Sequence, residues 1–201
     1  MALEGFPKKA NLRDGSQVLL RPLSFEDAEA LLLLYRGLPE EDRLVLRDDV
    51  TRSEWSERFL TKVALGDVIS IVAVIDGRLV GEASLYRQRH GWTAHVGEFR
   101  VSVDRAHQRQ GLGFVLAREL VRLARSLNLE KLVAQMVETQ LAALRVFEKL
   151  GFVKEAVLKG HVKDAGGQKR DLLLLANDAI RIMETIDSLP PDPPRSAGEE
   201  S

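Results

Sequence analysis

Cysteine is missing from all 201 positions of the sequence. The chain can therefore form no disulfide, no thiolate metal site and no acyl-cysteine intermediate. An excess of charge of either sign is missing as well, because 29 Lys and Arg residues nearly balance 30 Asp and Glu residues and leave a formal net charge of -1. No overall basic field would attract nucleic acid or an anionic membrane, so we expect neither as a partner. Any anion that binds must be held by a local site.

Long apolar runs are also absent. No stretch approaches the roughly 20 apolar residues of a membrane-spanning helix, and the first nine residues lack the apolar segment of a signal peptide. We therefore expect a cytoplasmic protein. A chain of this length with 45% apolar residues can bury one substantial core, which favours one domain with one site. We predict no metal site in it.

Strand and helix patterns alternate along the chain. Strands are predicted at residues 17–23, 68–75, 78–87, 95–103, 131–137, 152–163 and 170–176, and helices from residue 24 and at 53–65, 112–127 and 139–150. The Asp76-Gly77 turn predicts a hairpin at the centre of the sheet. Residues 95–137 form a strand-helix-strand unit, whose two strands should be parallel with a right-handed crossover. We therefore predict an α/β domain with a mixed, mostly antiparallel sheet, a central parallel strand pair and flanking helices.

The two ends of the chain are expected to lie outside this domain. Residues 1–15 are interpreted as an N-terminal extension and residues 178–189 as a C-terminal helix. Residues 190–201 are rich in proline and have almost nothing to bury, which predicts a disordered tail. If the protein forms a homodimer, the last hairpin and the C-terminal helix are the surfaces we expect it to use.

A glycine-containing loop joins the predicted strand 95–103 to the predicted helix 112–127. Residues 103–113 read Val-Asp-Arg-Ala-His-Gln-Arg-Gln-Gly-Leu-Gly. Backbone N–H groups and the helix dipole can hold a phosphate there, and Gly111 and Gly113 let the backbone approach it closely. The loop lacks the Gly-Lys-Ser/Thr of a P-loop, and Leu116 stands where a dinucleotide fingerprint requires its third glycine. Taken alone, the two glycines also suit an ordinary strand-to-helix turn.

Two motifs together resemble a known family. Gln108-Arg109-Gln110-Gly111-Leu112-Gly113 is similar to the Gln/Arg-x-x-Gly-x-Gly/Ala signature of the GNAT superfamily of N-acetyltransferases. Residues 143–152 resemble the alanine-rich helix of that family, which ends in an aromatic residue followed by Leu-Gly-Phe. The resemblance covers about residues 17–176 and assigns 16–177 to an N-acetyltransferase domain. It implies an acyltransferase that uses acetyl-CoA as co-substrate and passes the acetyl group to an amine.

The resemblance also implies roles for individual residues. Backbone N–H groups from Arg109 to Phe114 would bind the pyrophosphate of acetyl-CoA, and the backbone of Val101 and Val103 would pair with the pantetheine arm. The N–H of Val101 would donate to the thioester oxygen as it becomes an oxyanion. The implied cofactor-binding residues are Val101, Val103, Gln108, Arg109, Gln110, Gly111, Leu112, Gly113, Phe114, Gln140 and Phe147.

Two of these residues depart from the family pattern. Gln140 stands where relatives often have an asparagine beside the pantetheine, so its side chain reaches further. Phe147 stands where relatives often have a tyrosine that returns a proton to the CoA thiolate, and phenylalanine has no proton to donate. Phe147 is equally well interpreted as a core aromatic on an amphipathic helix.

The reaction needs a base, because an amine with a pKa near 10 is mostly protonated at neutral pH. Glu98 is the first candidate, since many relatives carry a glutamate on this strand; a slip of one residue in register would turn it to the other face of the sheet. Glu82, Glu138 and His161 are alternatives, each also interpretable as a surface residue. A sensor that binds acetyl-CoA without turnover, and a structural domain without a ligand, remain competing hypotheses. The acceptor stays open between small amines, amino acids, protein lysines and protein N-termini.

Overall fold

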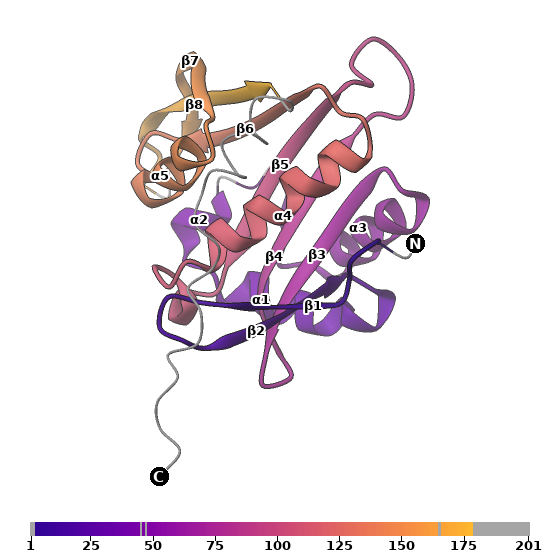
Figure 1. Cartoon of the computed structure of the whole chain (residues 1–201). Coiled ribbons are helices and arrows are strands. Elements are labelled where there is room, and N and C mark those ends of the chain that lie inside the picture. The colour runs from indigo at the N-terminus through magenta and orange to yellow at the C-terminus, as the bar shows by residue number, and fades with distance from the viewer. Residues whose placement is uncertain (1–2, 45, 47, 165, 179–201) are drawn as a thin grey trace.

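The apolar, β-branched segments form one eight-stranded sheet with the strand order β1-β2-β3-β4-β5-β6-β8-β7. The structure is a computed structural model that describes residues 3–44, 46, 48–164 and 166–178 (Figure 1). Its strands are β1 (Lys8–Asn11), β2 (Gln17–Pro22), β3 (Val68–Ile75), β4 (Arg78–Arg87), β5 (Val96–Val103), β6 (Lys131–Val137), β7 (Val153–Lys163) and β8 (Lys169–Asp178). Neighbouring strands are antiparallel except for β5 and β6, which are parallel. The predicted fold class is therefore confirmed.

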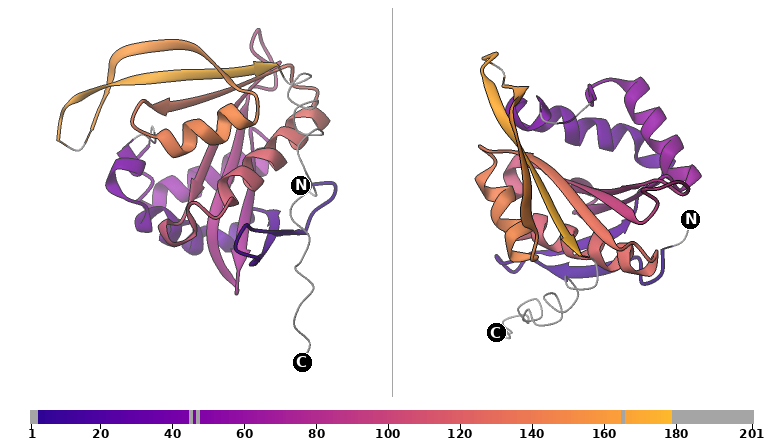
Figure 2. Two further views of the ribbon diagram at one scale, coloured as in Figure 1. Left: turned by 60° about the vertical axis from the view of Figure 1, so that its left-hand side comes forward. Right: turned by 90° about the horizontal axis from the view of Figure 1, so that it is seen from above.

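Helices cover both faces of the sheet. The first face carries η1 (Phe25–Asp27), α1 (Ala28–Gly37), α2 (Glu40–Leu44) and α3 (Ser53–Leu65), whereas α4 (Leu112–Ser126) and α5 (Leu141–Lys149) cover the second (Figure 2). A short 3-10 turn, η2 (Arg105–His107), connects β5 to α4. Each layer has its own apolar core, one around Leu116 and Phe99 under α4 and one around Trp55 and Phe59 under α3. No helix in the described ranges is long and apolar enough to cross a membrane.

Side chains of β4 and β5 alternate between these two layers. Phe99 on β5 is buried in the core under α4. The next residue, Arg100, points to the opposite face and lies over the ring of Tyr86. Residues directly opposite in an antiparallel pair share a face, so Glu82 with Ser102, Ser84 with Arg100, and Tyr86 with Glu98 all lie on the side of α1 and α3. We refer to this side as the α1/α3 face.

Both ends of the described chain continue the sheet. β1 was not predicted; it pairs with β2 over Lys8 to Asn11, and Leu12 beyond it is buried. At the other end, β8 runs to Asp178, which pairs with Lys131 of β6, so the helix predicted for 178–189 does not begin at its first residue. The pairing with β6 keeps this residue extended. Residues 179–201, with the rest of that helix and the predicted tail, lie outside the described residues.

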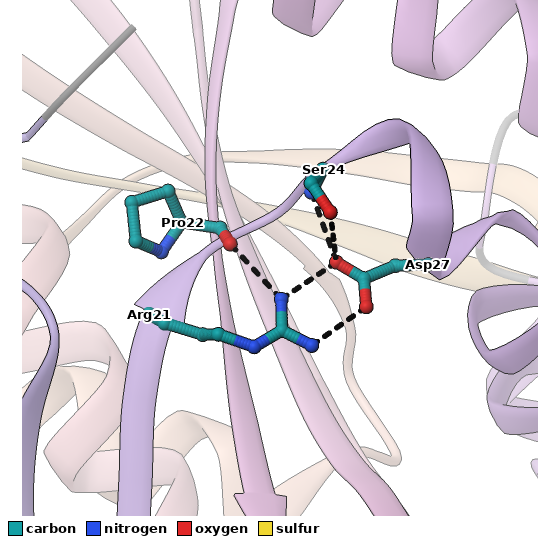
Figure 3. A network of polar contacts seen from close by, with 4 residues as sticks. All are labelled: Arg21, Pro22, Ser24 and Asp27. Atoms are coloured by element: carbon teal, nitrogen blue, oxygen red, sulfur yellow. Dashed lines mark hydrogen bonds and ion pairs between the residues drawn. The ribbon is translucent and has the colours of Figure 1, made fainter.

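A partly buried ion pair fixes the start of the helical layer on the α1/α3 face. The two terminal guanidinium nitrogens of Arg21 on β2, Nη1 and Nη2, donate to the carboxylate of Asp27, each at 2.6 Å, and the N–H of Ser24 donates to the same carboxylate at 2.9 Å (Figure 3). Burial would raise the pKa of Asp27, but the hydrogen bonds from Arg21 and Ser24 outweigh it and hold the pKa below its ordinary value. The end of β2 and the start of α1 are thereby joined.

Candidate active site

The parallel strands β5 and β6 separate before they end. Their pairing covers Val96 to Phe99 on β5 and Lys131 to Ala134 on β6. Beyond this point β5 continues to Val103 paired with β4, and β6 continues to Val137 paired with β8. Within the described ranges, the edge of residues 100–103 that faces β6 has no strand partner. An unpaired edge of this kind binds extended ligands as if they were another strand, and Val101 and Val103 lie on it.

The loop after β5 presents the uncapped end of a helix beside this gap. Gly111 is the N-cap of α4 and has φ 94°, and the N-cap supplies no side-chain hydrogen bond. The first turn of α4 contains no acidic residue, so its N–H groups and the positive end of the helix dipole are suited to an anion. Arg109 also has a positive φ, 63°. A non-glycine residue in this region is strained, and such strain is found most often at functional sites.

The glutamine side chains of the loop brace the loop itself. Nε2 of Gln108 donates to the carbonyl of Val103, and Nε2 of Gln110 donates to the carbonyl of Ala106, each at 3.3 Å. One amide N–H of each side chain is thereby used within the loop. Arg13, which the sequence did not single out, supports the loop from the β1–β2 turn: its N–H donates to the carbonyl of Gln110 at 3.0 Å.

The far side of the gap is formed by the end of β6 and by α5. Gln140 folds back so that its Oε1 accepts a hydrogen bond from the N–H of Val137 at 2.9 Å. Phe147 is only 5% exposed, and its ring meets that of Phe152 edge-on at a centroid distance of 5.0 Å. The structure therefore places Phe147 in the core, as one of its two interpretations expected. No proton donor replaces the missing tyrosine at this position.

The four candidates for a base lie in very different surroundings. Glu98 is on the α1/α3 face with its side chain 22% exposed, and its Oε1 is 3.9 Å from Nη2 of Arg100. Glu138 is exposed at the end of β6, and His161 is exposed on β7, the edge strand of the sheet. Of these three, Glu98 is the one on a strand that borders the gap and on the face covered by α1 and α3. The pairing of β5 with β4 fixes the register of Glu98, which the sequence left uncertain by one residue.

Glu82 is the candidate that the sequence misjudged. Its interpretation as a surface residue is wrong, because the side chain is fully buried. Three hydroxyls donate to its carboxylate: those of Ser70 and Ser84 to Oε1 at 2.5 and 2.8 Å, and that of Tyr35 to Oε2 at 2.9 Å. Burial raises the pKa of Glu82 above its ordinary value even though these hydrogen bonds oppose the shift. We call Glu82 with its three hydroxyl donors the Glu82 cluster.

Tyr86 and Arg100 complete the polar part of the α1/α3 face. The guanidinium carbon of Arg100 lies 4.4 Å from the centre of the Tyr86 ring, and its Nη1 donates to the Tyr86 hydroxyl at 3.4 Å. Burial raises the pKa of Tyr86 to about 12, so the phenol stays protonated at neutral pH. A polar strip therefore runs across β4 and β5 beside the point where β5 and β6 separate.

The site therefore combines a strand gap with the uncapped N-terminus of a helix. Such a site in an α/β protein is suited to an extended ligand that carries an anionic group. Comparison with known proteins identifies the class. The model of the family described as "Acetyltransferase (GNAT) family" matches residues 31–152. The chain therefore belongs to the GNAT family of acetyltransferases, and by family it is an acyltransferase.

Two curated relatives are named N-acetyltransferases. The chain is 30% identical over 164 residues to "Probable N-acetyltransferase YjcK" of Bacillus subtilis, covering 76% of this chain and 89% of that protein. It is 26% identical over 145 residues to "L-amino acid N-acetyltransferase AaaT" of Escherichia coli, covering 72% of this chain and 88% of the relative. Both alignments extend well beyond a single motif.

Solved structures share the fold at low sequence identity. A GNAT acetyltransferase from Streptococcus pneumoniae superposes with a TM-score of 0.72 at 22% identity, covering 80% of this chain and 99% of the other. The yncA acetyltransferase of Salmonella typhimurium, determined with acetyl-CoA, gives 0.70 at 21% identity, covering 81% and 94%. These similarities establish the fold alone.

Proposed function

We propose that this protein is an N-acetyltransferase that moves the acetyl group of acetyl-CoA directly to an amine. The observation that carries the proposal is the gap between β5 and β6, which ends at the uncapped N-terminus of α4. An extended chain with a pyrophosphate at one end matches a strand edge followed by a helix N-terminus. The relatives are named N-acetyltransferases, and a protein of the same fold was determined with acetyl-CoA.

The backbone of the loop and of β5 would hold the co-substrate. In the proposal, the N–H groups from Arg109 to Phe114 bind the pyrophosphate, and the free edge at Val101 and Val103 aligns the pantetheine arm. Gln140 offers its Nε2 from the other side, because its Oε1 is already bonded to Val137. When bound, acetyl-CoA supplies an acetyl group activated as a thioester.

Glu98 and Val101 would act on the acceptor and on the carbonyl. Glu98 takes one proton from the acceptor ammonium, which frees the nitrogen lone pair. The nitrogen then attacks the carbonyl carbon, a C–N bond forms, and the N–H of Val101 donates to the developing oxyanion. As the intermediate collapses, the C–S bond breaks and the electron pair leaves with the CoA sulfur. The second amine proton goes to that thiolate or to solvent, so no side-chain acid is needed.

Thermal unfolding with and without acetyl-CoA tests the binding step. A ligand present at 100 times its dissociation constant stabilises the native state by about 2.7 kcal/mol, so we expect a clear rise in Tm. Gly111→Glu should abolish the rise. A Cβ at this position would lie 3.3 Å from Cγ of Arg13 on a backbone with φ 94°, which strains the loop, and the added carboxylate brings negative charge to a site suited to an anion. An unchanged Tm of the unmodified protein at saturating acetyl-CoA would contradict the proposal. Binding without any turnover on a broad amine panel would favour the sensor hypothesis instead.

A further inference from the structure

Arg100 is the cation on the α1/α3 face where the two parallel strands separate. Phe99, the residue before it, is the last residue of β5 that pairs with β6. The side chain of Arg100 is 17% exposed, and its guanidinium carbon lies 4.4 Å from the centre of the Tyr86 ring, a cation–π contact that arginine forms more often than lysine.

The hydrogen-bonding capacity of Arg100 is largely unused. A guanidinium has five N–H donors. Within the ranges that the structure describes, Arg100 makes two polar contacts, with the Tyr86 hydroxyl at 3.4 Å and with Oε1 of Glu98 at 3.9 Å. Both exceed the 2.7–3.2 Å of a good N–H···O hydrogen bond. The carboxylate of Glu82 is bonded to its own three hydroxyls. The ion pair of Arg100 with Glu98 is long, at 3.9 Å, so the guanidinium can still form shorter hydrogen bonds with a second carboxylate.

We propose that the acceptor is a free α-amino acid whose carboxylate binds Arg100. The proposal rests on the proposed function, because it requires that the amine of the same molecule receives the acetyl group. A carboxylate fits the guanidinium fork with two parallel hydrogen bonds. Glu98 lies two residues earlier on the same face and is a carboxylate. Arg100 and Glu98 thus present one positive and one negative group side by side, which matches the neighbouring carboxylate and ammonium of a zwitterion.

Other amine classes match this pair less well. The α-amine of a protein N-terminus is followed by a neutral amide, and a lysine side chain carries no carboxylate near its amine. A polyamine would bring positive charge against Arg100 and repel it. The pair therefore selects for a carboxylate attached to the carbon that bears the reacting amine.

Acceptor pairs that differ only in this carboxylate test the proposal. Release of CoA thiol from acetyl-CoA is measured with a panel of common L-amino acids, each compared with its own carboxamide and its decarboxylated amine. We expect kcat/KM for at least one free acid to exceed that for its amide by about 100-fold, the size of a charge-assisted hydrogen-bonded pair. Arg100→Gln should bring this ratio close to one, chiefly through a higher KM for the acid. Arg100→Lys, which keeps the charge and loses the fork, should give an intermediate ratio.

Controls separate this proposal from folding effects and from the proposed function. Arg89→Gln changes an exposed arginine of the β4–β5 loop and should leave the ratio as it is. Circular dichroism and the acetyl-CoA shift in Tm check that the Arg100 variants fold. Equal activity on acids and amides, or equal losses on both in Arg100→Gln, would overturn the proposal. If no acceptor releases thiol, the proposed function fails. Binding of an amino acid to Arg100 is then tested by Tm: the proposal expects an amino acid to raise the Tm of the unmodified protein but not that of Arg100→Gln.

Discussion

The hydroxyl of Tyr35 on α1 donates to the carboxylate of Glu82 on β4 at 2.9 Å, and both side chains are buried. This bond joins the helical layer to a central strand of the sheet. Because β4 is the antiparallel neighbour of β5, it also sets the position of α1 relative to Glu98 and Arg100. The Glu82 cluster therefore holds the face on which we propose that the acceptor binds.

Glu82→Gln and Glu82→Ala should differ sharply in stability. In Glu82→Gln, Oε1 can still accept from Ser70 and Ser84, while Nε2 donates to the Tyr35 oxygen. We expect a free energy of unfolding within about 1 kcal/mol of the unmodified protein at pH 7. Glu82→Ala leaves three buried hydroxyls unpaired beside a cavity and should cost about 2–4 kcal/mol. Urea unfolding measures both; equal stabilities for the two variants would contradict a cluster held by hydrogen bonds.

The raised pKa of Glu82 predicts a pH dependence with a definite sign. Its folded-state pKa lies above the ordinary value of 4.5, and burial is the main cause. The carboxyl therefore adds stability below pH 4.5 that is lost as the pH rises through the folded-state pKa. In Glu82→Gln this loss should disappear. As the pH rises from 4, the unfolding free energy of Glu82→Gln should therefore increase relative to that of the unmodified protein. A difference that does not change with pH would contradict the raised pKa of Glu82.

Asp27 should show the opposite trend. Its pKa lies below 3.8 because the hydrogen bonds from Arg21 and Ser24 outweigh burial, so its contribution is present above that pH and is lost as the pH falls through the folded-state value. Asp27→Asn should destabilise the protein at pH 7 by about 1–3 kcal/mol, and the deficit should shrink in acid. Asp49→Asn is a suitable control, because Asp49 belongs to an exposed ion pair and should change stability by less than about 1 kcal/mol.

Gly113→Ala should separate stability from binding. A Cβ at this position would meet only Val103, at 3.8 Å, and the backbone has no left-handed φ. Alanine is the better helix former by about 1 kcal/mol, so the ligand-free protein should become slightly more stable. The added methyl would lie where the pyrophosphate approaches, and the Tm shift with acetyl-CoA should fall. Gly37→Ala at the end of α1 is the matched control. An undiminished Tm shift in Gly113→Ala would contradict the proposal that this loop binds the pyrophosphate.

Glu98→Gln tests the choice of base. Loss of a general base typically costs 100-fold or more in rate, so we expect kcat at pH 7 to fall about 100-fold with little change in KM for acetyl-CoA. The loss should diminish at high pH, where the amine deprotonates in solution. Glu138→Gln, which changes an exposed glutamate at the end of β6, should stay within about twofold. A larger loss in Glu138→Gln than in Glu98→Gln would reassign the role.

The central strands were predicted almost to the residue. Val68–Ile75 and Arg78–Arg87 are strands as expected, because β-branched runs and the Asp76-Gly77 turn are local signals. The glycine loop was found for the same reason: its residues are consecutive. Whether each of its N–H groups contacts a ligand stays a prediction.

Features set by distant partners could not be predicted. β1 is short and polar, and it becomes a strand because β2 offers an edge to pair with. Burial of Glu82 depends on Tyr35, which lies 47 residues away in the sequence. The position of Arg100 over the Tyr86 ring follows from the pairing of β4 with β5. Sequence patterns record local periodicity, whereas these features depend on which elements pack together.

The most direct test of the account is acetyl transfer itself. The purified protein is incubated with acetyl-CoA and a panel of free amino acids and other amines, while CoA thiol is followed optically and the acetylated product by mass spectrometry. The account predicts that thiol release depends on both protein and amine, with one acetylated amine formed for each CoA released. Acetyl-CoA that stays intact over the whole panel, with no acetylated amine detected, would contradict it.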